Sequence, residues 1–304
     1  MPLNLAALAF FGVCWGASIP LLKFAVAAGY HPLGMMIWQL AISVLIIGGY
    51  LLWRAIPLRI GRQNLGYLLL IAMIGTLIPN TFSLLATRYL PGGIIAIVIA
   101  TVPIMSLLIA LSARIESFSW LRFSGIVLGV VSLLLIAVPD ASLPDPGKAP
   151  WILVALIAPV CYAIEGNFVA VRAPAELTAV TTLFGASACG LILLVPFVYA
   201  NGWEVPVLVA WDATRWAIVS AAVGHMIAYT GYLWLLGRAG AVFTSQVAYI
   251  VTLTGVVLSV MFLGERYGIT LWIAVALMFA ALALVKPVKR KHGKPPEPPA
   301  ASRR

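Results

Sequence analysis

The most regular feature of the chain is a succession of long apolar runs separated by short polar stretches. A helix needs about 20 apolar residues to cross a hydrocarbon core of roughly 30 Å. The runs are continuously apolar, whereas the strands of a membrane barrel alternate between apolar and polar positions. The sequence therefore predicts an all-α membrane protein with ten transmembrane helices. The predicted spans are 3–22, 33–53, 65–86, 91–112, 121–138, 151–171, 177–199, 215–236, 240–262 and 268–286.

The composition excludes a water-soluble globule. Hydrophobic residues make up 63% and charged residues 9% of the 304 positions, against roughly half and a quarter in soluble proteins. The longest polar run is 286–304, which is too short for a catalytic domain. We expect 287–304 to be a basic, Pro-rich, disordered tail on the anionic cytoplasmic leaflet. The net charge of +10 therefore indicates membrane topology, and no nucleic-acid partner is expected.

The basic residues predict the orientation of the spans, because cytoplasmic loops carry an excess of Lys and Arg. With both termini in the cytoplasm, only Lys23, Arg88, Lys148, Arg215 and Arg266 of the 19 basic residues fall outside. The sequence thus predicts a multi-pass protein with cytoplasmic N- and C-termini. The basic residues then placed inside are Arg54, Arg59, Arg62, Arg114, Arg122, Arg172, Arg238, Lys286, Lys289, Arg290, Lys291, Lys294, Arg303 and Arg304.

The cysteines indicate neither a disulfide framework nor a metal site. Cys14, Cys161 and Cys189 all lie in apolar runs with no cluster of His, Asp or Glu around them. The chain begins without a basic segment before its first apolar run, so we expect this run to stay as a membrane span. We predict no metal, no cofactor and no catalytic residues.

The two halves of the chain resemble each other. Gly12–Ser18 aligns with Pro159–Glu165 at a shift of 147 residues, and Gly75 aligns with Gly224 at a shift of 149. At the same shift, the segment from Pro103 to Glu116 meets the segment from Thr252 to Glu265. A unit of five spans is odd, so the second copy must lie upside down in the membrane. The sequence predicts two inverted five-helix repeats, 1–138 and 151–286, joined by an outer linker at 139–150.

Four short motifs carry a family resemblance. They are Trp15-Gly-Ala-Ser18, Tyr89-Leu-Pro-Gly-Gly93, Pro103 thirteen residues before Glu116, and Leu263-Gly-Glu-Arg266. With these motifs the chain resembles the twice-repeated EamA unit of the drug/metabolite transporter superfamily, over essentially its whole length to about Lys286.

The resemblance implies a ten-helix carrier of the bacterial inner membrane, often an exporter of amino acids or related metabolites. It also implies a central cavity lined by the first, third, fourth, sixth, eighth and ninth helices. The chain departs from the family at two places. Members commonly carry an Arg in the second span where this chain has Trp38-Gln39, and the second copy has Thr252 where the first has Pro103.

Two ionisable residues lie well inside predicted spans, where each costs about 2.5 to 3.5 kcal/mol. Glu165 of the sixth span is read either as a carboxylate that binds a proton or a substrate amine, or as a structural carboxylate held by a neighbouring helix. His225 of the eighth span is read either as a proton carrier or as a buried neutral imidazole.

Polar and aromatic side chains at helical spacing form a second group of candidates. An apolar cavity with a few hydrogen-bonding groups suits a small amphipathic solute. The same residue types also populate the aromatic belts at the membrane surface. With Glu165 and His225, the residues that we predict to line a substrate cavity are Trp15, Ser18, Asn80, Thr101, Tyr162, Tyr229 and Tyr249.

These features favour a secondary transporter that exports small organic solutes such as amino acids by alternating access. Its expected partners are the solute, the lipid bilayer and protons, and it acts as a monomer or homodimer. One alternative is a proton-coupled exporter of drugs and other cationic compounds. A nucleotide-sugar or sugar-phosphate carrier needs deep Arg or Lys residues, and an intramembrane enzyme needs a nucleophile with a base or a metal set. The sequence favours neither.

Overall fold

The computed structural model describes the whole chain except residues 1, 59, 114–117, 138–144, 207–210 and 285–304. The tail predicted at 287–304 and the first half of the predicted linker, 139–144, lie outside the described residues. Everything described is helix, turn or loop, without a strand. Seven helices are long and apolar enough to cross a membrane, and three further apolar helices are shorter. The predicted all-α membrane fold is confirmed.

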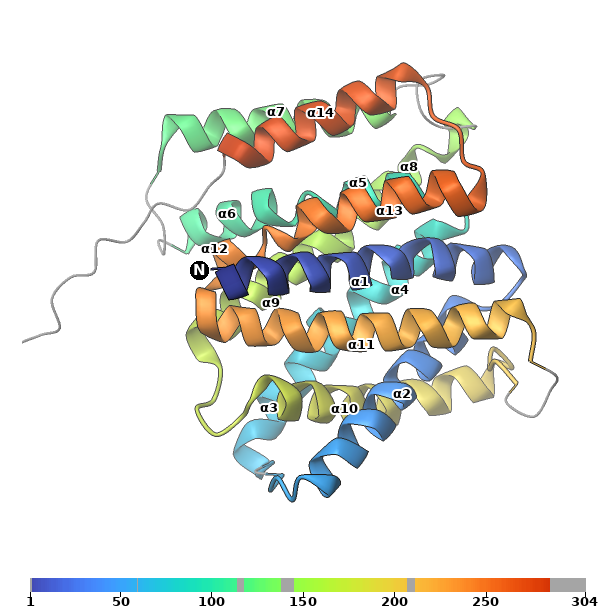
Figure 1. Ribbon diagram of the computed structural model, residues 1–304, viewed down its shortest axis with the longest axis vertical. Coiled ribbons are helices and arrows are strands. Elements are labelled where there is room, and N and C mark those ends of the chain that lie inside the picture. Colours follow the sequence, from blue (N-terminus) through green and yellow to red (C-terminus); the bar gives the residue numbers. More distant parts are fainter. Residues whose placement is uncertain (1, 59, 114–117, 138–144, 207–210, 285–304) are drawn as a thin grey trace, which may run out of the picture.

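The first half of the chain contains five apolar helical rods (Figure 1). The third rod is interrupted by a π-helical segment, η1, and the fourth is broken into two α-helices. The elements are α1 (Pro2–Ala27), α2 (Pro32–Trp53), α3 (Arg62–Leu70), η1 (Ile71–Leu77), α4 (Ile78–Thr87), α5 (Gly92–Ile99), α6 (Val102–Ser112) and α7 (Trp120–Ala137).

The second half repeats this order. Its first rod is broken at Leu156, just before Pro159, and its fourth begins with one short helical turn. The elements are the 3₁₀ turn η2 (Pro146–Lys148), α8 (Pro150–Ala155), α9 (Ile157–Arg172), α10 (Ala179–Ala200), α11 (Ala213–Ala239), α12 (Ala241–Thr244), α13 (Val247–Leu263) and α14 (Ile269–Leu284).

Corresponding rods of the two halves run in opposite directions. In Figure 1, α1 leads away from the end that holds the N-terminus, whereas α8 and α9 lead towards it. The pair α7 and α14 shows the same reversal. We call the end that holds Pro2 the near end and the opposite one the far end. The five-helix unit is therefore inverted in its second copy.

Glycines let α1 lie deep between its neighbours. A Cβ at Gly12 would fall 2.6 Å from the Ile250 side chain, and a Cβ at Gly16 would fall 2.7 Å from the Val251 carbonyl oxygen. Both contacts are made with α13. Small residues spaced four apart allow such close approach of membrane helices, where dispersion forces drive association. The Gly12–Gly16 face therefore packs inside the bundle.

Helices α7 and α14 form a separate pair at one edge of the bundle (Figure 1). The Ser132 hydroxyl of α7 donates a 2.7 Å hydrogen bond to the carbonyl of Ala274 in α14, and both residues are fully buried. The core of this region is continuous with α5 and α13 and distinct from the core around α1, α9 and α11.

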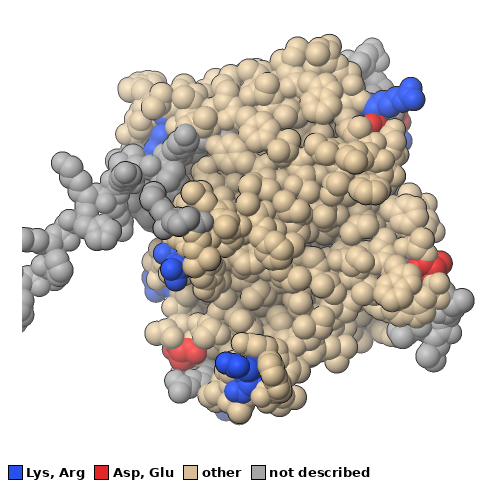
Figure 2. All heavy atoms as spheres, viewed as in Figure 1, with Lys and Arg blue, Asp and Glu red and all other residues tan. Residues whose placement is uncertain are grey.

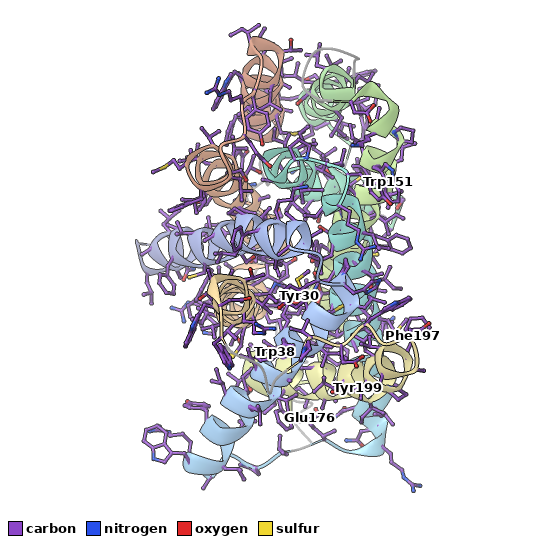
Figure 3. All side chains as sticks on the ribbon, turned by 90° about the vertical axis from the view of Figure 1, so that its right-hand side faces the viewer. Tyr30, Trp38, Trp151, Glu176, Phe197 and Tyr199 are labelled. Carbon is purple, nitrogen blue, oxygen red and sulfur yellow. The ribbon has the colours of Figure 1, made fainter. Side chains whose placement is uncertain are left out.

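Charged side chains gather at the two ends, and a wide uncharged band lies between them on the face shown in Figure 2. Figure 3 looks onto the far end, where Tyr30, Trp38, Trp151 and Tyr199 are labelled. Trp151 stacks on Tyr89 there with ring centroids 3.9 Å apart. This distribution is that of a protein with an apolar belt and two polar surfaces.

Hydrogen bonds at the far end join the two halves. The Glu265 carboxylate accepts from the backbone N–H groups of Gly92 at 2.7 Å and Gly93 at 3.2 Å, at the first turn of α5. The Tyr267 hydroxyl donates to the same carboxylate. Within the first half, the Lys23 ammonium of α1 donates to the carbonyls of Thr87 and Leu90. Glu265 is thus a helix cap that joins the second half to α5 of the first.

Candidate functional site

Trp15 occupies the middle of the bundle and is surrounded by aromatic rings. Its ring centroid lies 5.6 Å from those of Tyr162 and His225, 5.7 Å from that of Tyr232 and 6.3 Å from that of Tyr229. The rings come from α1, α9 and α11, so three helices meet at one point. Most of these pairs are edge-to-face, the arrangement in which one ring's positive edge meets another's negative face.

Glu165 lies beside this aromatic cluster. It is fully buried on α9, and its Oε1 accepts a hydrogen bond from the Tyr229 hydroxyl. Its Oε2 has no partner among the residues that the structure describes. The backbone of Gly75 covers the carboxylate on the remaining side, where an added Cβ would overlap both the carboxylate and the Tyr229 hydroxyl. A buried carboxyl group with one unused oxygen can hold a proton or bind a cation.

A short polar chain extends from the cluster towards the far end. The Tyr162 hydroxyl donates to Asn80 Oδ1 at 2.8 Å, and Asn80 Nδ2 donates to Gln39 Oε1 at 3.4 Å. Ser18, one turn beyond Trp15, donates to the Trp15 carbonyl at 2.6 Å. These groups line a cavity of about 40 Å³ with Ser83 and His225. A water needs about 10–15 Å³ of such space, so the cavity has room for waters and none for an amino acid.

His225 has the environment of a buried neutral base. It is 5% exposed, it lies against Trp15 and Tyr229, and its Nε2 has no hydrogen-bond partner in the described part of the chain. Glu165 and His225 face a common aromatic centre, which leaves both as candidates for a bound proton.

A larger cavity opens at the near end. Its volume is about 470 Å³, and its walls come from α3, α9, α10 and α11. Tyr67 lines this cavity and packs against the core that contains the cluster, and its ring stacks on that of Phe168 with centroids 5.9 Å apart. At the far end, a cavity of about 300 Å³ lies among Lys23, Arg88 and Glu265. We call these two cavities the near and the far vestibule; neither shares a lining residue with the central cavity.

The structure brings together seven of the nine predicted site residues, namely Trp15, Ser18, Asn80, Tyr162, Glu165, His225 and Tyr229. It places the other two elsewhere. Thr101 donates to the Val98 carbonyl at 2.7 Å at the break between α5 and α6, and Tyr249 stacks on Phe279 of α14 at 5.6 Å. That the seven bind a substrate stays a prediction.

Sequence reasoning left Tyr67 and Gly75 out of the site. Tyr67 lies near the start of a span, where tyrosines commonly lie at the membrane surface. A tyrosine at this position therefore does not indicate a place in the site. Gly75 was visible only as a match between the repeats. No group of three or more metal-ligating side chains occurs among the described residues.

The inverted rods agree with the comparison to known proteins. The EamA-like transporter family model matches residues 4–138 and again 149–286. The chain belongs to the EamA-like transporter family. It is therefore a transporter of the drug/metabolite superfamily and not an enzyme, and the two matches fall one on each inverted half.

Relatives place the chain in the inner membrane. The uncharacterized inner membrane transporter YedA of Escherichia coli K12 is 24% identical over 277 residues, which cover 90% of this chain and 87% of YedA. The YedA proteins of strains O6:H1 and O157:H7 match equally. A solved structure described only as the crystal structure of a protein superposes with a TM-score of 0.63 at 17% identity, over 91% of this chain and 94% of its own. That likeness shows the fold alone.

Proposed function

We propose that the protein exports small solutes that carry an amine, such as amino acids or related metabolites. The observation that carries this proposal is the Glu165 carboxylate, buried beside the Trp15 aromatic cluster with one oxygen unused. A carboxylate attracts an ammonium group directly, and aromatic faces attract the same charge through their quadrupoles. The two features together select a compact organic cation or zwitterion.

Alternating access accounts for how such a solute would cross. The central cavity is too small for a solute and shares no lining residue with the vestibules of about 470 Å³ and about 300 Å³ at the two ends. Rocking of the inverted halves would open one vestibule at a time onto Glu165. The basic residues of the loops support a cytoplasmic near end, so net export would run from the near vestibule to the far one.

A proton-coupled exporter of cationic compounds is the second candidate. In the part of the chain that the structure describes, no Lys or Arg pairs with Glu165, and His225 is the basic side chain of the cluster. A proton on the carboxyl group would therefore neutralise it when no solute is bound. An arriving cation would displace that proton, so the two would be exchanged at one group.

Anionic substrates fit the site poorly. Sugar phosphates need Arg or Lys at the binding point, and no Lys or Arg is among the described residues that line the central cavity. Lys23 is bonded to two backbone carbonyls, and Arg215 pairs with Asp212 at 3.2 Å. A free amine on the solute is thus the feature to test.

The decisive experiment compares amino acids with their keto and hydroxy analogues, which lack the amine. Purified protein in liposomes should exchange labelled amino acids in counterflow and should not exchange the analogues. Glu165→Gln should weaken binding by about 10- to 100-fold, because a hydrogen bond to a charged group contributes about 1.5–3 kcal/mol. Glu204→Gln, at an exposed far-end loop, is the matched control and should exchange like wild type. Equal exchange of the analogues would overturn the proposal.

Coupling is tested separately by an imposed pH gradient. Under the second candidate, an outward proton gradient, with the lumen acidic, drives uptake of a cationic probe such as tetraphenylphosphonium into inverted vesicles, and Glu165→Gln abolishes this dependence. Transport that ignores the gradient in the wild type would reject proton coupling and leave a facilitator.

A further inference from the structure

The central site is built from corresponding positions of the two inverted copies. The shift of 147 that pairs Ser18 with Glu165 also pairs Trp15 with Tyr162. The shift of 149 that pairs Gly75 with Gly224 also pairs Asn80 with Tyr229. One half of the site thus holds Glu165, Tyr229 and Gly75. The other half holds their counterparts, which are Ser18, Asn80 and Gly224.

The half towards the near end is tightly closed. Gly75 of η1 lies directly on the Glu165 carboxylate and the Tyr229 hydroxyl, so closely that even a Cβ at this position would overlap both. A Cβ at this position would therefore force the two buried side chains or η1 itself to move.

The half towards the far end is packed less tightly. Ser18 and Asn80 are smaller than Glu165 and Tyr229, and they line the cavity of about 40 Å³. Here the corresponding glycine, Gly224, faces the backbone of α1, where a Cβ would lie 3.1 Å from the Cys14 carbonyl oxygen. At that distance the Cys14 backbone would have to give by a few tenths of an ångström. The overlap is therefore larger at Gly75, where it involves side chains, than at Gly224, where it involves backbone.

The backbone that carries Gly75 is unusual. Residues Ile71–Leu77 form a π-helix between α3 and α4, and Pro79 follows directly. π segments are rare, occur mostly as single turns inside α-helices, and are frequent at functional sites. A change of this segment towards α-helical winding would move α3 relative to α4 without breaking the span. Since α3 carries Tyr67 of the near vestibule, the same movement would join that vestibule to Glu165.

We propose that the π segment Ile71–Leu77 is the gate over Glu165 and that Gly75 is the residue that allows this gate to close. In the closed form Gly75 covers the carboxylate. In the open form η1 lies farther from α9, and Glu165 communicates with the near vestibule past Tyr67. The inference deepens the proposed function, since it names the element that controls access to the solute-binding group.

The test measures access to Glu165 and does not depend on transport. Dicyclohexylcarbodiimide, an apolar reagent that adds to protonated carboxyl groups, is applied to purified protein at one fixed pH, and the adduct is counted by mass spectrometry. Glu165→Gln gives the background. Gly75→Ala should raise the labelling rate at Glu165 about tenfold, which corresponds to about 1.4 kcal/mol against the closed form, within the cost of an added methyl group in a packed core.

Gly66→Ala is the matched control. Gly66 lies on the same span in α3, is exposed, and has no heavy atom within 4 Å of an added Cβ. It reproduces the higher helix propensity of alanine without the overlap, so its labelling rate should equal that of wild type. Equal labelling of a folded Gly75→Ala protein and wild type would overturn the proposal.

A second measurement uses wild-type protein and needs no substitution at Gly75. The bulky adduct on Glu165 can exist only if η1 has moved, so hydrogen exchange of the Ile71–Leu77 amides should rise about tenfold or more after labelling. The amides of Gly92–Ile99, a buried segment of the same half, should not change. An adduct that leaves Ile71–Leu77 protected would refute the gate. Failure of amino acid exchange with this pattern intact would instead reject the proposed solute.

Discussion

The far-end cap on α5 gives the sharpest prediction on stability. Glu265→Ala removes the acceptor of the Gly92 and Gly93 N–H groups, which lie 2.7 Å and 3.2 Å from the carboxylate. Both glycines are buried, so water does not readily replace the lost oxygen atoms. The Gly93 N–H keeps a second acceptor, the Tyr267 hydroxyl at 2.9 Å. The net loss is therefore one fully orphaned N–H group and one weakened one.

This loss converts into a free energy of unfolding. A buried donor left without an acceptor costs about 1–3 kcal/mol, and a hydrogen bond to a charged acceptor contributes about 1.5–3 kcal/mol. The negative charge beside the start of α5 adds about 0.3–1 kcal/mol through the helix dipole. We expect Glu265→Ala to lower the free energy of unfolding by about 2–3 kcal/mol, and Glu265→Gln by about half as much because glutamine keeps one acceptor oxygen.

Unfolding of the purified protein in mixed micelles, followed by circular dichroism, measures this difference. The control is Asp145→Ala, which removes an exposed 3.5 Å ion pair with Lys148 in the same far-end region. Exposed pairs contribute about 0–1 kcal/mol, so this variant should unfold close to wild type. If Glu265→Ala and Asp145→Ala unfold alike, the carboxylate does not hold α5 and the reasoning from burial is wrong.

Three further predictions concern other parts of the fold. His31 Nδ1 accepts from the Leu33 N–H at the start of α2, and burial lowers the pKa of His31. The unfolded chain therefore binds a proton at His31 more readily than the folded one, and the melting temperature of the wild type should fall as pH drops below about 6.5. His31→Asn should remove the part of this fall that is due to His31. Ser132→Ala, which deletes the bond to Ala274, should cost about 0.6 kcal/mol, the average for hydrogen bonds between membrane helices; a loss above about 2 kcal/mol would contradict it. Burial and the adjacent carboxylate raise the pKa of Tyr267. The contribution of Tyr267 to the free energy of unfolding should therefore persist to about pH 10 and decline above it. Tyr267→Phe should abolish that decline.

The helical fold could be predicted from hydropathy, and its irregularities could not. Each predicted apolar run coincides with a helical rod, because a span must satisfy its backbone within itself. The break at Thr101 before Pro103 and the one at Leu156 before Pro159 follow from proline, which has no N–H to donate. The π winding at Ile71–Leu77 has no comparable signal, since it changes the register of the backbone and leaves composition untouched.

The part of the candidate site that could be predicted consists of polar side chains whose burial in the membrane is costly. Glu165 and Asn80 stand out inside apolar runs because an ionised or amide group there needs a partner. Tyr249 was predicted by the same reasoning and instead stacks on Phe279. Helical spacing fixes which residues share a face, but it does not fix which neighbouring helix that face meets. Only the packed structure decides this.

The environment of Trp15 has a spectroscopic consequence. Of the ten tryptophans, all of them described by the structure, Trp15 alone is buried, while Trp53 and Trp120 are 78% and 77% exposed. Its indole is the tryptophan ring in contact with His225, Tyr162, Tyr229 and Tyr232, so a molecule that enters the cluster would quench or shift its emission. Fluorescence of the unmodified protein, read against Trp15→Phe, can therefore find a ligand without any label.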